Sequence, residues 1–591
     1  MALKLTLIRK QIQLFFLRLI QRINLPEEFY MLFLAAIIGI FAGLGAYVLN
    51  LFINGFHFTF FRKVLSFSHY QGLTYVLLIL FPAIGGLIVG LVIHFFSRES
   101  RGHGVPSVIE AIANRDGFIR PRVTLITSFT AAATIGTGGS AGKEGPIIQI
   151  GAAIGSSVGQ LFNVSSNRLK VLVGTGAGAG LAAVFNAPVA GVLFALEVLL
   201  ADFSISAFTP IIFATVISTT ISHYLIGSSP VLHVPIYYLE SVFEYPLYLF
   251  MGVLGGTVAV LFTKTLYMTE DLINKYIHLP EYYKPALGGL FVGVITLFFP
   301  EIYGFDDQAI HNALLARTAI QTLFLLTIFK IIATSLTLGS GGSGGLFIPS
   351  LFVGASFGAL FGSIMNHFFP AITATPGAYA LVGMGIMVAG TTHATISALM
   401  LIFEITSNYQ IILPLMLGTI IATITSRLIL KENIYTMKIA LSGEYIFKGR
   451  NITLLQSIPI HQHIQRKFDS IPEHLTFGKI LDLLRRSQHS TFPVINQRKK
   501  IVGIVSLQNI RSYMFEKELY PLLIARDIMQ EDFISIHPDQ SLAEVLRLFD
   551  LTDAELIPVT DRKDKHHLIG VIYRDELMSW YRKAPLLSPE K

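Results

Sequence analysis

A single glutamate stands inside a glycine-rich break in a long apolar region, in the segment 142–146 (Gly-Lys-Glu-Gly-Pro). Glycine frees the backbone on both sides of Glu144, and proline at position 146 suits the first turn of a helix. A helix that begins here points unpaired N–H groups and a partial positive charge at whatever lies before it, which predicts an anion-binding site. Glu144 is itself an anion. It can occupy that site when ionised and leave it when protonated, so one side chain has the chemistry of both a gate and a proton carrier.

The composition places this segment in a membrane. Of the 591 residues, 52% are hydrophobic and 14% are charged, and the mean hydropathy is +0.62, whereas a soluble domain carries about a quarter charged residues. Apolar stretches that are long or nearly long enough to span about 30 Å of hydrocarbon lie at 31–49, 74–96, 247–261 and 411–424. Many are interrupted by Gly or Pro, which favours tilted and broken helices around a protein-lined cavity.

Charge and cysteine content exclude several classes of protein. Residues 1–25 carry five basic residues and no acid, which predicts an amphipathic helix on the cytoplasmic surface over residues 1–28. This segment lacks a small-residue cleavage site, so we do not interpret it as a signal peptide. The net charge of +7 fits basic cytoplasmic loops, and no nucleic-acid-reading motif accompanies it. With no cysteine in the chain, disulfides and thiolate metal sites are excluded.

The apolar region contains an internal repeat, which predicts two homologous halves at about 30–230 and 240–430. One set of residues recurs 203 positions further on and a second set recurs 207 positions further on. Transporters built from such halves are often inverted in the membrane, which would bring both glycine-rich loops to one site at the midplane. The alignment places Phe347 opposite Glu144. The matching residues are Gly138, Gly139, Ser140, Gly142, Pro146 and Gly151 with Gly341, Gly342, Ser343, Gly345, Pro349 and Gly354, and then Gly176 and Glu197 with Gly383 and Glu404.

From about residue 451 the composition becomes that of a soluble α/β domain with a repeat of its own. Each unit of about 60 residues has a helical pattern, a short strand (492–494 or 557–559), a charged turn and a second strand (501–506 or 568–573). This arrangement resembles a tandem pair of CBS domains, at about 455–518 and 525–585 of a cytoplasmic region 446–591. The resemblance implies that an adenine nucleotide is a possible ligand.

The nucleotide signature of CBS domains is incomplete in both units. The usual pattern is Gly, then Thr or Ser three residues later, then Asp six residues after the Gly. The first unit has Ser506 and Asn509 at these positions, so the carboxylate is lost, and the second has Tyr573 and Glu576, so the small hydroxyl is lost. Two interpretations stay open, a nucleotide site that uses these four residues and a structural dimerisation module.

The chain resembles the CLC family of chloride channels and chloride/proton antiporters over almost its whole length. Residues 142–146 match the gating-glutamate motif of that family, residues 345–349 (Gly-Leu-Phe-Ile-Pro) match its second anion-binding loop, and Tyr435 stands where the family has an inner-gate tyrosine. Two further landmarks are 185–188 and 403–406. The resemblance implies that the anion is bound by His103, Gly104, Gly142, Lys143, Gly145, Leu346, Phe347, Ile348 and Tyr435.

The same resemblance implies an all-α polytopic membrane domain over 29–445, built from two inverted repeats of tilted, broken helices and ending in a helix at 431–445. It also implies a homodimer with one path per subunit, chloride as the ligand, no required cofactor or metal, and no enzymatic activity. We expect an integral protein of the bacterial inner membrane with both termini in the cytoplasm.

Two positions depart from the family pattern. His103 stands where the family usually has a serine that donates to chloride, and a charged imidazole would bind the anion in a pH-dependent way. Val198 stands where many antiporters carry a glutamate that receives protons from the cytoplasm. Valine cannot hold a proton. We expect chloride/proton exchange, favoured narrowly over a passive chloride channel, because Glu144 permits coupling while Val198 removes the usual proton route.

Two rival classes fit less well. A CBS-containing cation transporter needs clustered oxygen ligands, and in the apolar stretches only Glu144, Glu197 and Glu404 stand out, which are not paired. Glu197 and Glu404 occupy matching positions in the two halves, which predicts a structural role in tying loops. An intramembrane metalloprotease needs a His-Glu-x-x-His helix, and none of the 17 histidines is followed directly by Glu.

Overall fold

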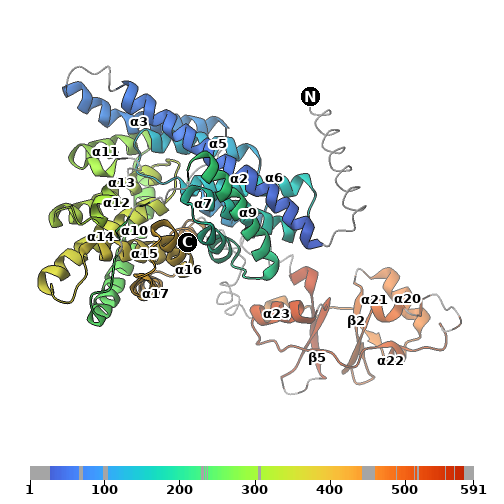
Figure 1. Ribbon diagram of the computed structural model, residues 1–591. Coiled ribbons are helices and arrows are strands. Elements are labelled where there is room, and N and C mark those ends of the chain that lie inside the picture. The colour runs from blue at the N-terminus through green and yellow to red at the C-terminus, as the bar shows by residue number, and fades with distance from the viewer. Residues whose placement is uncertain are drawn as a thin grey trace. The chain divides into compact units, whose positions relative to one another are not determined.

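The chain forms two compact units, residues 1–442 and 443–591, in a computed structural model (Figure 1). The boundary falls three residues before the predicted one. The predicted amphipathic helix lies outside the described residues as far as position 26. The described residues are 27–64, 71–96, 104–227, 232, 234, 235, 237–303, 308–441 and 460–577, the last range without 488, 512, 515–517, 519, 553, 563 and 565.

The first unit, called here the membrane unit, is helical throughout its described part (Figure 1). Eight of the described helices are long and apolar enough to cross a membrane. Its elements are α2 (Glu27–His57), η1 (Phe58–Val64), α3 (Gln71–Phe96), α4 (Val105–Asn114), α5 (Arg122–Gly136), α6 (Glu144–Leu161), α7 (Ser166–Phe185), α8 (Pro188–Phe194), η3 (Ala195–Leu200), α9 (Ile205–Leu225), η4 (Val242–Glu244), α10 (Tyr245–Tyr276), α11 (Lys284–Phe298), η5 (Pro300–Ile302), α12 (Gln308–Leu314), α13 (Ile320–Gly339), α14 (Phe347–Phe368), α15 (Pro376–Thr392), α16 (Thr395–Thr406), α17 (Ile412–Ile429) and α18 (Thr436–Leu441).

The two halves are inverted with respect to one another. The matching helices α3 and α11 pack together through glycines, since a Cβ on Gly86 would collide with the backbone of Pro285 and a Cβ on Gly289 with that of Pro82. Further along, a Cβ on Gly90 would collide with the backbone of Tyr282, and one on Gly293 with that of Ile79. Residue numbers rise along one helix as they fall along the other, so these two matching helices run antiparallel. Equivalent helices of two halves that run antiparallel to one another indicate an inverted repeat, as the sequence predicted.

The inversion extends to details of the backbone. The helices α7 and α15 both end on a residue in the left-handed conformation, Asn186 (φ 53°) and His393 (φ 57°). The glycines that open the two loops, Gly138 and Gly341, have φ angles of 102° and 104°, a conformation that favours glycine. The repeat therefore preserves turns as well as helices.

The last helix of the membrane unit is shorter than predicted. We expected a helix over 431–445, but the described helix α18 begins at Thr436. The amide oxygen of Asn433 accepts hydrogen bonds from the N–H groups of Tyr435 (2.9 Å) and Thr436 (2.8 Å), and the Thr436 hydroxyl accepts one from the N–H of Asn433 (3.0 Å). These side-chain bonds cap the helix at this point, so residues 431–435 form the turn that carries Tyr435. Positions 442–445 lie outside the described residues.

The second unit, called here the CBS unit, contains all the described strands (Figure 1). In its first repeat β1 runs parallel to β2, and β2 runs antiparallel to β3. In the second, β4 and β5 are antiparallel. The elements are η6 (Ile460–His463), β1 (Ile471–Pro472), α20 (Phe477–Arg486), β2 (Thr491–Ile495), β3 (Ile501–Ser506), α21 (Leu507–Arg511), α22 (Ala525–Ile528), α23 (Leu542–Thr552), β4 (Leu556–Thr560) and β5 (Leu568–Tyr573).

The two repeats of the CBS unit exchange their leading segments. Ile460, at the start of the first repeat, is buried in the core of the second, with Ile536 and Val545. Ala525 and Ile528 of α22, at the start of the second repeat, are buried in the core of the first. Each hydrophobic core is therefore completed by the other repeat, and neither is a self-contained domain.

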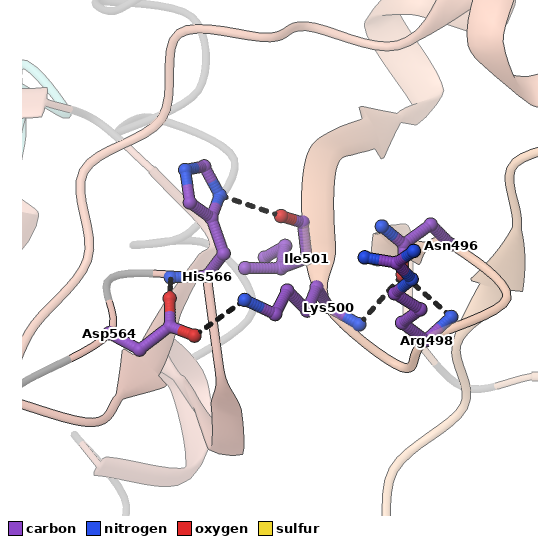
Figure 2. Close-up of polar contacts among 6 residues, drawn as sticks. All are labelled: Asn496, Arg498, Lys500, Ile501, Asp564 and His566. Atoms are coloured by element: carbon purple, nitrogen blue, oxygen red, sulfur yellow. Dashed lines mark hydrogen bonds and ion pairs between the residues drawn. The ribbon is translucent and has the colours of Figure 1, made fainter.

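The turns after β2 and after β4 also contact one another (Figure 2). Lys500 Nζ lies 2.7 Å from Asp564 Oδ2, the N–H of Ile501 donates to the carbonyl of His566 (2.8 Å), and His566 Nδ1 donates to the carbonyl of Ile501 (3.1 Å). The hydrogen bond from Lys500 is the main cause that holds the pKa of Asp564 below its usual range. These polar contacts add to the exchanged core segments in joining the two repeats.

Candidate functional site

Two glycine-rich loops meet on the axis that relates the halves. The N–H of Gly142 donates to the carbonyl of Gly345 (2.9 Å), and the N–H of Gly345 donates to the carbonyl of Gly142 (2.7 Å). This antiparallel bridge joins the two residues that the sequence repeat places in register.

Hydroxyl groups on the preceding helices fix both loops in the same way. The N–H of Ser140 donates to Thr337 Oγ1 (3.1 Å), and the N–H of Ser343 donates to Thr134 Oγ1 (3.2 Å). Each threonine belongs to the opposite half. The sequence analysis missed Thr134 and Thr337, although they are 203 positions apart, the same interval as the loops that they support. Testing every polar residue at that interval would have found them.

Glu144 occupies the centre of this arrangement. It is the first residue of α6 and is fully buried. Its Oε1 accepts a hydrogen bond from the N–H of Phe347, the first residue of α14. Its Oε2 has no hydrogen-bond partner among the described residues. A Cβ added to Gly142 or to Gly345 would collide with the carboxylate. A carboxylate from one half therefore sits at the N-terminus of a helix from the other, where a partial positive charge attracts anions.

A third helix N-terminus lies against the same segment. Gly104, which precedes α4, has a φ of 78°, and a Cβ there would collide with the carbonyl of Gly145. Only glycine suits both the conformation and the close approach. The N-termini of α4, α6 and α14 thus converge around residues 142–145 and 347. His103 lies outside the described residues. Lys143 is half-buried and interacts electrostatically with Glu144.

Aromatic rings link the second loop to Tyr435. The ring of Phe347 lies 5.9 Å from that of Phe185 and 6.2 Å from that of Phe194, and Phe194 meets the ring of Tyr435 edge-on at 6.4 Å. Leu346, Phe347, Ile348 and Tyr435 are all buried. The hydroxyl of Tyr435 interacts electrostatically with Glu144, so the inner tyrosine and the central glutamate belong to one site.

Glu197 and Glu404 tie the halves together reciprocally. The carboxylate of Glu404 accepts hydrogen bonds from the N–H groups of Val189 (3.0 Å) and Ala190 (2.7 Å), at the start of α8. The carboxylate of Glu197 accepts them from the N–H groups of Ile396 (3.3 Å) and Ser397 (2.8 Å), at the start of α16. Each glutamate caps a helix of the opposite half, which is the tying role that the sequence predicted. Val198, next to Glu197 in η3, is half-buried.

The CBS unit contains a cavity of about 870 Å³ between its repeats. Ser506, Tyr573 and Glu576 line it, whereas the amide oxygen of Asn509 accepts hydrogen bonds from the N–H (3.0 Å) and hydroxyl (2.6 Å) of Ser506. The Tyr573 ring stacks on that of His489 at 3.6 Å. Burial is the main cause that raises the pKa of Tyr573 to about 12.

The lining of this cavity is acidic. Asp532, Glu555, Asp575 and Glu576 face it together with one arginine, Arg574. Carboxylates in excess repel a polyphosphate chain, so the charge of this cavity does not favour a nucleoside triphosphate. In the part of the chain that the structure describes, no group of three or more His, Cys, Asp or Glu side chains is arranged to hold a metal ion.

Comparisons with known proteins give a consistent match. A family model described as voltage gated chloride channel matches residues 85–427, and a CBS domain model matches residues 460–516 and 525–583. The chain is 28% identical to chloride channel protein CLC-f of Arabidopsis thaliana over 94% of this chain and 81% of that protein. It is 30% identical to the H(+)/Cl(-) exchange transporter ClcA of Vibrio campbellii over 71% of this chain and 90% of that protein.

Two solved structures share the fold. A slow cyanobacterial Cl-/H+ antiporter has a TM-score of 0.65 and 24% identity, covering 71% of this chain and 98% of that one. A eukaryotic CLC transporter also has a TM-score of 0.65, with 20% identity, covering 92% of this chain and 97% of that one. At these identities the likeness concerns the fold alone.

Proposed function

Because the chain belongs to the family of voltage-gated chloride channels and carries two CBS domains after its membrane unit, we propose that it moves chloride across a membrane along a path gated by Glu144. The observation that carries this proposal is the Glu144 carboxylate bonded to the N–H of Phe347. An anionic side chain at a convergence of helix N-termini occupies a place that suits a dehydrated chloride ion.

Gating follows from competition between two anions. Ionised Glu144 fills the site and excludes chloride, and the protonated side chain loses its electrostatic attraction to the N-terminus of α14 and leaves. Chloride then binds to the N–H groups of the 142–146 and 345–349 loops, with Gly104 on the third side. Tyr435 closes the inner side of the path, below Phe194 and Phe347. Acid therefore speeds transport.

We further propose that chloride movement is coupled to protons moving the other way. Glu144 alternates between ionised and protonated forms as it leaves and re-enters the site, so each cycle carries a proton as well as exchanging the anion. The relatives named as H(+)/Cl(-) exchange transporters support this choice. The alternative is a passive, pH-gated or voltage-gated channel, which Val198 favours because it holds no proton.

The orientation that we propose has both termini in the cytoplasm of a bacterial inner membrane. The start of α2 packs beside the end of α6 and the start of α7, through Met31, Val158 and Leu172. The neighbouring loops at 115–122 and 163–170 carry five basic residues, and short basic loops face the cytoplasm.

We propose a homodimer with one path in each subunit and a CBS unit whose first role is structural, given the acidic lining of its cavity.

Chloride efflux and external pH, recorded together on purified protein in liposomes, test both proposals. We expect proton uptake driven by the chloride gradient in the wild type and faster efflux at acidic pH. Glu144→Gln should keep chloride flux, lose proton uptake and lose most of the pH dependence. The matched control is Glu110→Gln, the same substitution at a glutamate of α4 that pairs with Arg115. It should behave like the wild type.

Two other results would contradict the proposals separately. Chloride efflux in Glu144→Gln that is no faster and no less pH-sensitive than in the wild type removes Glu144 as the gate. Fast chloride efflux with no proton movement in the wild type leaves the gate intact and makes the protein a channel.

A further inference from the structure

The inner end of α10 carries a carboxylate that the path described above does not use. Glu270 lies in the last two turns of α10, a helix longer than the roughly 20 residues that about 30 Å of hydrocarbon needs. Its side chain is 26% exposed, so water reaches it. Its Oε1 lies 3.4 Å from Nζ of Lys438, a residue of α18 that is three positions after Tyr435.

Tyr267, one turn before Glu270 on the same face of α10, connects this carboxylate to the inner tyrosine. Its side chain is buried, and its hydroxyl donates to the carbonyl of Ile434 at 2.6 Å. The Tyr267 hydroxyl interacts electrostatically with Glu270 and with Tyr435, and Tyr435 interacts in turn with Glu144. Groups that act on one another electrostatically therefore connect a partly exposed acid at the end of α10 with the central glutamate, and the one direct bond among these segments joins Tyr267 to the Tyr435 turn.

Other acids of the membrane unit are held in a different way. The oxygens of Glu197 and Glu404 accept backbone N–H bonds at the starts of α16 and α8. The fully buried Glu244 accepts hydrogen bonds from the N–H groups of Ala374 and Glu240 and from the Tyr379 hydroxyl. These backbone and hydroxyl donors fix the position of each carboxylate. Glu270 pairs instead with a lysine side chain on a neighbouring helix, a partner that can separate from it.

We propose that Glu270 is the residue that takes up protons at the inner end of the path, in place of the carboxylate that is missing at Val198. This inference rests on the proposed chloride/proton exchange. Glu270 accepts a proton from a hydronium ion, which leaves as water, and later returns it to water in the path, from which Glu144 takes it. Tyr267 is a positioning residue, because its bond to the Ile434 carbonyl holds the Tyr435 turn beside the acid.

The pair with Lys438 makes proton uptake depend on the inner gate. Lys438 and Tyr435 belong to one short segment, so an outward movement of that segment takes the cation away from Glu270. A carboxylate that loses a nearby cation binds a proton more readily. Among the described residues, the charged and titratable groups recorded as interacting with Glu270 are Lys438 on α18 and Tyr267 on α10. Asp271 is its neighbour in the sequence, and α13 approaches its backbone at Gly339.

Proteoliposomes of the full-length protein test this inference with the neutral variant Glu270→Gln. We expect chloride efflux within about twofold of the wild type and a proton-to-chloride flux ratio reduced about tenfold or more, which is the scale of losing one proton-transfer group. Glu270→Asp, which keeps a carboxylate, should restore part of the coupling. Asp271→Asn is the matched control, because it removes an exposed acid from the neighbouring position on the same helix, and it should leave the ratio unchanged.

The outcomes separate this inference from the proposed exchange. Unchanged coupling in Glu270→Gln, with a coupled wild type, overturns the inference and leaves exchange standing. Loss of both fluxes in Glu270→Gln and in Glu270→Asp assigns the pair with Lys438 a structural role and also overturns it. No proton movement in the wild type removes exchange itself, and this inference with it. Tyr267→Phe, which removes only the hydroxyl, should lower the ratio less than Glu270→Gln does.

Discussion

In the first half of the membrane unit the glycine-rich loop leads into Glu144, and in the second half the matching loop leads into Phe347. The backbones of the two loops are alike, with mutual hydrogen bonds between Gly142 and Gly345 and one supporting threonine from each half. The side chains differ completely. One is an acid that titrates, and the other is a buried ring beside Phe194.

Glu197 and Glu404, by contrast, are matching positions at which the side chain is the same in both halves. They are alike in sequence and in their backbone contacts, since each accepts two N–H bonds from the start of a helix in the other half. Glu197 accepts one bond more, from the Ser397 hydroxyl (2.6 Å). Positions that keep the symmetry of the repeat join the two halves, and the position that breaks it is the one to which we assign the gating chemistry. Two loops with an acid in both would place two negative charges in one anion site, where they would repel each other.

Alanine at the two paired glycines should have the largest effect and should separate the two loops. At Gly345 an added Cβ lies 2.5 Å from the backbone nitrogen of Gly145 and also meets the Glu144 carboxylate, so the backbone must move, and overpacking of this kind costs about 1–3 kcal/mol. At Gly142 the nearest atoms are those of the flexible Glu144 carboxylate. We expect Gly345→Ala to reduce the rate of chloride efflux about tenfold. Gly142→Ala should keep the wild-type rate but show a weaker dependence on pH. Equal efflux from the two variants would contradict this.

Removing Glu197 or Glu404 should have a smaller effect, on the stability of the membrane unit. Glu197→Ala and Glu404→Ala each leave two backbone N–H groups without their acceptor, at a cost of about 1–3 kcal/mol. We expect both variants to lower the midpoint of thermal unfolding in detergent, and Glu197→Ala to lower it slightly more, because it also loses the bond from the Ser397 hydroxyl. A midpoint lowered by only one of the two variants would contradict a stabilising role for both contacts.

The contact between the CBS turns should give the smallest effect. The pKa of Asp564 is held below its usual range, chiefly by the hydrogen bond from Lys500, so ionised Asp564 stabilises the contact. That contribution is complete above the usual pKa of an aspartate, about 3.9, and is lost as the pH falls through the lower folded value. Asp564→Asn should therefore speed hydrogen exchange at the Ile501 amide slightly at pH 7 and leave it unchanged at acidic pH. Equal acceleration at both pH values would point to a cause other than charge.

The interval of 203 residues was enough to predict which residues of the two halves correspond, because the same backbone turns need glycine in both halves. It did not predict that Gly142 and Gly345 bond to each other, since sequence similarity does not locate a symmetry axis. The structural role of Glu197 and Glu404 was predicted from their matching positions. Their partners, the starts of α16 and α8, follow only from the packing of the halves.

Glu270 had no such signal in the sequence. It is one acid in a span that also contains Lys264 and Asp271, and the repeat does not single it out. Its partner Lys438 is more than 160 positions away and follows the capped turn at Asn433. In the CBS unit the sequence predicted the repeats and their strands, whereas the exchange of Ile460 and Ala525 between the two cores was missed, because burial patterns do not say which core a segment joins.

The reciprocal capping of α8 and α16 also sets an order for the synthesis of the chain. The N–H groups of Val189 and Ala190 find their acceptors on Glu404, which the ribosome adds 214 residues after Ala190. At about 5–20 residues per second, this interval is roughly 10–40 s. During that time the first half, already in the membrane, has a helix without its cap, so its final packing must wait for the second half to be inserted.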